Sequence, residues 1–313
     1  MQSGGKGVPG AVLKGSVLTL TLYLLFTALP VIGLPAGVLL PFPCIYYSIK
    51  FGRQVGYAIV ALMLFLLAVL DRAGMILYLL QSVPCSLLLP EFLLRGKTGA
   101  RSILYSVAIN AGIIALFAAL SMFFLDGDLD AEIGKVLRAS LNQASEMYRQ
   151  SGVAGDDLKA LDLALAQTQE LIQKFYPALS LILLGIGAGF NLLLLRRLSG
   201  SLGKELSLGS FSGYRNSDFL VWLFILPGFA LLTENAIVDR IAMNIMAVTV
   251  FLYLVQGAAI VTWFSRKLSI PRFVMLFFYV LLLFQPIFAA AVAAFGLFDL
   301  WANFRAPKKN TNL

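Results

Sequence analysis

Long apolar segments follow one another along most of the chain, and one polar interval of about 50 residues, 126–174, interrupts them. A helix needs roughly 20 apolar residues to cross the hydrocarbon core of a bilayer. By this measure the pattern predicts nine spans, at about residues 16–33, 36–49, 54–70, 74–94, 102–125, 176–195, 217–233, 241–264 and 273–297. The second is short and contains Pro35, Pro41 and Pro43, so we expect a broken or half-length helix there.

The polar interval predicts two amphipathic helices joined by a glycine-containing turn. Its apolar residues recur at helical spacing. They are Ile133, Val136, Leu137, Leu141, Ala144, Met147 and Tyr148 in the first helix, and Leu158, Leu161, Leu165, Thr168, Leu171, Ile172 and Phe175 in the second. Ser151, Gly152 and Gly155 separate the two, and Asp156 is suited to cap the second. Such a hairpin either buries its apolar faces between its own helices or on the bilayer, or forms a lid over a cavity.

Composition agrees with a membrane protein. Hydrophobic residues make up 59% of the 313 residues and charged residues 13%, against about 25% charged residues in soluble domains. The fold class we expect is therefore all-α, a polytopic membrane helix bundle of eight or nine spans with an extracytoplasmic two-helix hairpin, and its first partner is the lipid bilayer. The net charge of +8 does not indicate a nucleic-acid partner, because the basic residues cluster at segment ends.

The basic clusters also predict the orientation. They lie before the first predicted span and after the second, fourth, sixth and eighth, so all fall on one side of the membrane if the spans alternate. That side is the cytoplasm, which places the N-terminus inside and residues 126–174 outside the cytoplasmic (inner) membrane of a bacterium. Nine spans, however, would export the basic tail that begins at Arg305. Eight spans is the alternative, with the second segment or the last, broken at Pro286, miscounted.

The same pattern divides the chain. We expect a cytoplasmic N-terminus at 1–15, a six-helix membrane block at 16–197 that includes the hairpin, a cytoplasmic loop at 198–216, a C-terminal membrane block at 217–304 and a basic tail at 305–313.

The chemistry that the chain offers is limited. It contains no histidine, and Cys44 and Cys85 both lie in apolar stretches, where we expect them to pack as small hydrophobes. Asp126, Asp128 and Asp130 lack the glycine and glutamate register of a calcium loop. We therefore expect no catalytic residue, no metal site and no cofactor, and a protein that is not an enzyme.

Polar residues within apolar segments are costly and often functional. Asn110, Gln256 and Gln285 lie deepest, and Gln81 and Asn191 lie nearer span ends. Hydrogen bonding between helices is the simpler explanation for each. Gly185 and Gly189 form a small-residue pair for close helix packing, or for close approach of the backbone to a ligand.

Two stretches resemble known families. The run from Gly296 to Arg305, with Asp299, Trp301 and Phe304 between them, resembles the ending of the YybS-like bacterial membrane proteins, a family without an assigned activity. The stretch LLPFPCIYYSIKFGRQVGYAIVALMLFL, residues 39–66, resembles a segment of the substrate-binding S components of energy-coupling factor transporters. The second resemblance implies a six-helix substrate-binding bundle gated by external loops.

We derive two hypotheses about function. The first is a small-molecule binding or transport component, with ligand contacts from the fourth to sixth spans, namely Asn110, Gln81, Gly185, Gly189 and Asn191. The second is a structural or assembly protein that docks another membrane or envelope protein through the external hairpin.

Overall fold

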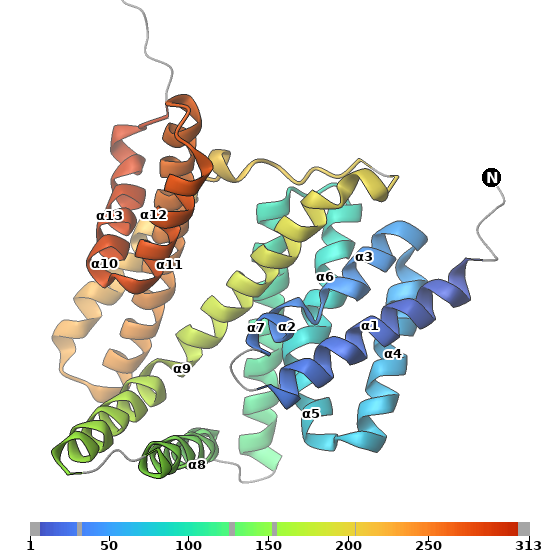
Figure 1. The fold of residues 1–313 in the computed structure, drawn as a ribbon. Coiled ribbons are helices and arrows are strands. Elements are labelled where there is room, and N and C mark those ends of the chain that lie inside the picture. Colours follow the sequence, from blue (N-terminus) through green and yellow to red (C-terminus); the bar gives the residue numbers. More distant parts are fainter. Residues whose placement is uncertain (1–6, 30–32, 125–128, 152–154, 204, 306–313) are drawn as a thin grey trace, which may run out of the picture. The chain divides into compact units, whose positions relative to one another are not determined.

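The computed structural model describes residues 7–29, 33–124, 129–151, 155–203 and 205–305, without the side chains of Leu129 and Asp156. Every regular element in these ranges is a helix (Figure 1). The chain forms two compact units. Unit 1 comprises Met1–Glu132 and Leu183–Gly209, and unit 2 comprises Ile133–Ile182 and Ser210–Leu313.

Unit 1 contains the N-terminal helices and the last third of a long helix, α9. Its elements are α1 (Val8–Ala28), α2 (Leu34–Leu39), α3 (Phe42–Phe51), α4 (Arg53–Leu70), α5 (Arg72–Leu77), a π-helical turn (Tyr78–Ser82), α6 (Val83–Leu94), α7 (Gly99–Phe124) and a short 3-10 turn (Ser199–Ser201). The boundary between the units falls within α9 (Asp156–Arg197).

Three apolar clusters fill the interior of unit 1. The first joins Ile45 of α3, Leu89 of α6 and Leu195 of α9, all fully buried. The second surrounds Cys44 and Ile59, and the third surrounds Met63 and includes Tyr23 and Tyr78. Small residues let these helices approach closely, as expected in a membrane. A Cβ on Gly15 would overlap the side chain of Ile59, and a Cβ on Gly56 would overlap that of Ser48.

Unit 2 contains most of α8 (Leu129–Gln150), the first part of α9 and the C-terminal helices. The C-terminal elements are two 3-10 turns (Phe211–Gly213 and Asp218–Val221), α10 (Trp222–Ala230), a further 3-10 turn (Leu231–Thr233), α11 (Ala236–Lys267), α12 (Arg272–Phe284) and α13 (Pro286–Ala302). Helix α11 packs against both α10 and α13. Ser145 and Arg149 of α8 both contact Asp162 of α9, at 2.8 and 3.4 Å. Near the other end of α8, a Cβ on Gly134 would lie 3.3 Å from the side chain of Gln173, so the two helices lie antiparallel.

The fold class is the expected all-α polytopic membrane bundle. Within the described residues seven helical segments are long and apolar enough to cross a membrane, or eight if a bent pair is counted as one span. That pair is α12 and α13, which meet at Gln285 with a bend of 106°. The last predicted segment, 273–297, is therefore not one straight helix, because Pro286 begins a new one. The segment at 217–233 is also short, a 16-residue run, Asp218–Thr233, that begins and ends in 3-10 turns.

The second predicted segment is broken, as expected, between α2 and α3 at Leu40 and Pro41. The expected separation of the hairpin from the sixth span, near residue 175, is absent. One helix, α9, runs for 42 residues across it, with Pro177 inside. The cap expected from Asp156 and the residues Asp126 and Asp128 lie outside the described part.

Candidate functional site

A carboxylate buried among apolar helices is the most unusual polar group in unit 2. Asp299, in the last turn of α13, is fully buried, and its side chain forms an ion pair of 2.8 Å with Arg305, whose own side chain is 12% exposed. Helix α13 ends at Asn303 in a left-handed conformation, φ 45°, which asparagine adopts more readily than most residues. This turn brings the Phe304 amide back to donate to the other oxygen of Asp299, at 2.9 Å.

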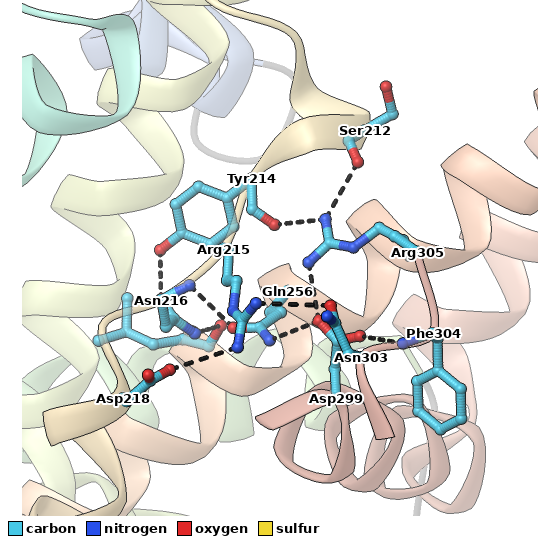
Figure 2. A network of polar contacts seen from close by, with 11 residues as sticks. Ser212, Tyr214, Arg215, Asn216, Asp218, Gln256, Asp299, Asn303, Phe304 and Arg305 are labelled. Carbon is cyan, nitrogen blue, oxygen red and sulfur yellow. Dashed lines mark hydrogen bonds and ion pairs between the residues drawn. The ribbon is translucent and has the colours of Figure 1, made fainter. Parts of the chain in front are cut away.

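Arg305 connects the end of the chain to the loop before α10 (Figure 2). Its guanidinium donates to the backbone carbonyls of Ser212, at 3.1 Å, and Tyr214, at 2.8 Å. Arg266, in the last turn of α11, donates to the hydroxyl of the same Ser212, at 3.2 Å. The last turn of α11 and the segment that follows α13 therefore meet at one loop.

Gln256 of α11 completes this network. Its amide nitrogen donates to Asp299 at 3.1 Å, and its amide oxygen accepts from the backbone of Asn216 at 2.9 Å. Asn216 in turn donates to the carbonyl of Leu252 and accepts from the hydroxyl of Tyr214. The sequence interpretation of Gln256 as a hydrogen-bonding residue between helices is confirmed.

We call Asp299, Arg305, Gln256 and Asn216 the C-terminal latch. Every polar side-chain atom of Asp299 and Gln256 has a partner within the chain. A buried polar network in which all groups are satisfied specifies one packing arrangement, and it leaves no group free to bind or react. The latch is therefore a structural element.

The rest of the family-like ending supports the latch. A Cβ on Gly296 would overlap the carbonyl oxygen of Tyr253, and one on Gly257 would overlap that of Val292, so only glycine allows α13 and α11 to approach this closely. Phe304 packs near Phe295, with ring centroids 6.1 Å apart. Trp301, 69% exposed, faces away from the packed helices, as an anchor in the membrane interface does.

A second polar site surrounds Pro177 of α9. Proline has no backbone N–H, so the carbonyl of Gln173 loses its helical donor, and Arg240 of α11 donates to it instead, at 3.1 Å. The next helical bond is replaced as well. Asn244 accepts from the Ala178 amide and donates to the Lys174 carbonyl, each at 2.9 Å. Side chains of α11 thus repair the break, which explains why α9 continues through the proline.

Beside this repair lies an open groove of about 410 Å³, within the size range of small-molecule sites. Its walls are residues of α9 and of the start of α11, namely Glu170, Gln173, Lys174, Ala236, Asp239, Arg240 and Met243. One carboxylate oxygen of Asp239 is buried and accepts no hydrogen bond from the described residues. This charged groove thus differs from the latch, because it contains an acceptor that the described residues leave unsatisfied.

Two ionisable groups in connecting segments have shifted pKa values. The pKa of Asp71 is lowered, because the carboxylate accepts from the Gly74 amide at the start of α5 and also from the Tyr23 hydroxyl. Burial raises the pKa of Tyr214 in the loop of the latch. Both shifts preserve the ordinary neutral-pH form of the group, so neither indicates an acid or base prepared for catalysis.

The residues predicted to bind a ligand lie on α7, on the π-helical turn and on α9, all within unit 1. Asn110 is 1% exposed and Asn191 fully buried, each with an unpaired amide oxygen, whereas Gln81 is exposed on the π-helical turn. Asn191 donates to the carbonyls of Val38 and Gly187, so it ties α9 to α2. Their role in ligand binding stays a prediction.

At Gly189 the structure differs from the packing interpretation of the glycine pair. A Cβ on Gly189 would meet no atom within 4 Å, whereas Gly185 is half-buried. Close packing through Gly189 is therefore not observed, and the approach of a ligand to Gly185 or Gly189 stays a prediction.

Sequence reasoning missed the charged groove. Glu170 and Lys174 lie on the second amphipathic helix, of which the pattern identifies only the apolar face. Asp239 and Arg240 lie between the predicted spans 217–233 and 241–264, where charged residues are expected in any case. Pro177 was the one available signal, because a proline within a helical pattern leaves a carbonyl that needs another donor.

Comparison with known proteins agrees with this architecture. A family described as predicted membrane protein DUF2232 matches residues 17–300. The chain is 23% identical over 308 residues to a Bacillus subtilis (strain 168) protein named Uncharacterized protein YybS, covering 96% of this chain and 98% of that protein. No solved structure matches the chain. The family match spans nearly all of both membrane units and includes the latch residues Gln256 and Asp299, and the chain belongs to the DUF2232 family of predicted membrane proteins.

Proposed function

We propose that the protein lies in the bacterial cytoplasmic membrane with both termini in the cytoplasm and residues 126–174 outside. The contacts at Ser212 support this orientation. Arg266, in the last turn of α11, and Arg305, after α13, bind the same residue, so α12 and α13 form a re-entrant pair rather than a ninth span. Eight crossings, α10 among them, then place every basic cluster on the positive, cytoplasmic side.

Fusions at two positions test this topology. Green fluorescent protein fused after Leu313 is expected to fluoresce, and alkaline phosphatase there to be inactive, because the first folds in the cytoplasm and the second requires export. Alkaline phosphatase fused after Glu234, before α11, is the matched control and should be active. Active phosphatase after Leu313 would refute the re-entrant arrangement.

We propose further that the protein is a small-molecule binding or transport component, and that it catalyses no reaction. The observation that carries this proposal is the charged groove between α9 and α11, with its unsatisfied Asp239 oxygen. Interrupted helices add support, because transporters use them at substrate sites. Here α12 and α13 are interrupted at Gln285, where they meet with a bend of 106°.

The proposed site differs from the one implied by the S-component resemblance. That resemblance concerns residues 39–66 of unit 1, whereas the groove belongs to unit 2. In this proposal the second half of the chain binds the ligand, and the first half supplies the membrane scaffold.

A ligand screen tests the proposal. The purified protein is heated in detergent with amino acids, vitamins, nucleobases, sugars and inorganic ions in separate samples. A true ligand raises the midpoint of unfolding by mass action, and the rise should disappear in Asp239→Asn but not in Asp157→Asn, an exposed acid outside the groove. If no compound shifts the midpoint, binding of small molecules is refuted for these classes.

A second function, docking of an envelope protein, is favoured by one observation. Val136, Met147 and Tyr148 of α8 are 67, 63 and 51% exposed, which leaves apolar surface on an arm proposed to lie outside the membrane. Crosslinking in whole cells from a site on α8 should capture a defined partner, and the triple change V136S, M147S and Y148S should abolish the capture. Crosslinking to lipid alone would exclude this docking role.

A further inference from the structure

The charges of the groove indicate which class of ligand it takes. Each wall contributes both signs: α9 supplies Glu170 and Lys174, one helical turn apart, and α11 supplies Asp239 and Arg240. A site for a simple anion or cation would present one dominant sign. Two acids and two bases instead suit a molecule that carries a positive and a negative group together.

Asp239 is the residue best suited to bind the positive group. One of its carboxylate oxygens is buried and has no donor in the described chain, and an ionised carboxylate only accepts hydrogen bonds. The neighbouring Arg240 does not donate to this oxygen. Among its contacts are the Gln173 carbonyl and the ring of Tyr176. A donor from a ligand, such as a protonated amine, would complete this site with a charge-assisted bond.

Lys174 is the residue best suited to bind the negative group. Its backbone carbonyl is held by Asn244 at 2.9 Å, which fixes the helix at this point, while its side chain is exposed at the groove. A lysine ammonium is a compact charge with three donors, which is well matched to a carboxylate. Ala236 and Met243 add apolar surface between the charges for the body of the ligand.

Building on the proposed function, we infer that the ligand is a zwitterion of the amino-acid or short-peptide class, with its amine on Asp239 and its carboxylate near Lys174. The groove of about 410 Å³ is large enough for a dipeptide and open at one side. No covalent step is involved.

Matched analogues test the inference. Binding to the full-length protein in detergent is measured by thermal unfolding with the twenty common amino acids and with a panel of dipeptides. Each compound that stabilises is compared with its N-acetyl form, which lacks the ammonium, and with its C-terminal amide, which lacks the carboxylate. Both analogues should bind at least about tenfold more weakly, the scale of one lost charge-assisted hydrogen bond.

Variants locate the two contacts. Asp239→Asn should weaken binding of the unmodified zwitterion by about tenfold and leave the already weak binding of the N-acetyl analogue unchanged. Lys174→Gln should likewise weaken binding of the zwitterion by about tenfold and leave the already weak binding of the C-terminal amide unchanged. Asp157→Asn and Lys97→Gln change charges outside the groove and should leave binding as in the parent protein. Because Asp239 and Lys174 lie at an open groove, we expect their substitution to leave the fold intact. The unfolding midpoint of each variant without ligand checks this.

The outcomes separate this inference from the function on which it rests. Stabilisation by zwitterions that depends on both charged contacts supports both. Stabilisation only by another class of compound, lost in Asp239→Asn, overturns the zwitterion and leaves the binding function intact. Stabilisation by no compound, or binding by zwitterions that neither variant weakens, overturns the inference.

Discussion

At the scale of residues, two polar sites of unit 2 differ in how completely their groups are paired. In the C-terminal latch, Asp299 accepts from Gln256, Arg305 and the Phe304 amide. In the groove, one oxygen of Asp239 accepts nothing from the described chain. Because unpaired buried groups cost free energy, the first arrangement is explained by folding alone, whereas the second is the observation on which the proposed ligand site rests.

The latch predicts a large loss of stability when one charge is removed. Arg305→Gln leaves the fully buried Asp299 without its counter-charge, which typically costs about 3–5 kcal/mol. The exposed pair of Arg215 and Asp218, 3.5 Å apart, provides the control, and Arg215→Gln should cost about 0–1 kcal/mol. Unfolding in detergent by added denaturant measures both. Equal losses in the two variants would show that Asp299 is not held as described.

The sequence predicted single residues of the latch, but not the network they form. Gln256 was recognisable as a polar group in an apolar segment, and Asp299 and Arg305 were recognisable through the family-like ending. The contact of Arg305 with Ser212, 93 residues away in the chain, depends on how α13 folds back on α11. Local sequence patterns carry no information about such a distant pairing.

At the scale of elements, α9 shows how tertiary contacts override a local helix-breaking signal. A proline within a helix costs roughly 3 kcal/mol or more, and the pattern of polarity placed a boundary near residue 175. The helix nevertheless continues, because Asn244 and Arg240 bond to the groups freed by Pro177. The amphipathic arm and the membrane-spanning part are therefore one element.

This repair predicts a coupled pair of substitutions. Asn244→Ala should destabilise the protein by about 1–3 kcal/mol, since it leaves the Ala178 amide and the Lys174 carbonyl unpaired. When Pro177→Ala is already present, Asn244→Ala should be less harmful, because a regular helix supplies its own hydrogen bonds at this turn. A double-mutant cycle measures the coupling, and strictly additive effects would contradict the repair.

The close contact of α11 and α13 gives a second test at this scale. Gly296→Ala forces a methyl group against the Tyr253 carbonyl and should cost about 1–3 kcal/mol through strain. Gly112→Ala is the control, since a Cβ there meets nothing within 4 Å, and alanine should even stabilise the helix by roughly 0.5–1 kcal/mol. Unfolding midpoints of the two variants decide the matter, and a neutral Gly296→Ala would argue against the close packing.

At the scale of the whole molecule, composition and apolar length were enough to predict a polytopic all-α membrane protein. They could not give the number of crossings, because segment length alone does not separate a span from a re-entrant pair. The bend of 106° at Gln285 and the shared contact at Ser212 are the observations that support the proposed re-entrant pair. The groove was also beyond prediction, since its walls come from residues 170–174 and 236–243, far apart in the sequence.

The central proposal is that the open charged groove between α9 and α11 lies on the outer side of the membrane. Its most direct test is to introduce one cysteine, by Ala236→Cys, and to label it in intact cells with a membrane-impermeant maleimide. Cys44 and Cys85 are buried, so the parent protein measures the background, and Glu205→Cys, on the proposed cytoplasmic side, is the control. The account predicts that Ala236→Cys is labelled in intact cells and Glu205→Cys only after lysis; labelling of Ala236→Cys only after lysis would contradict it.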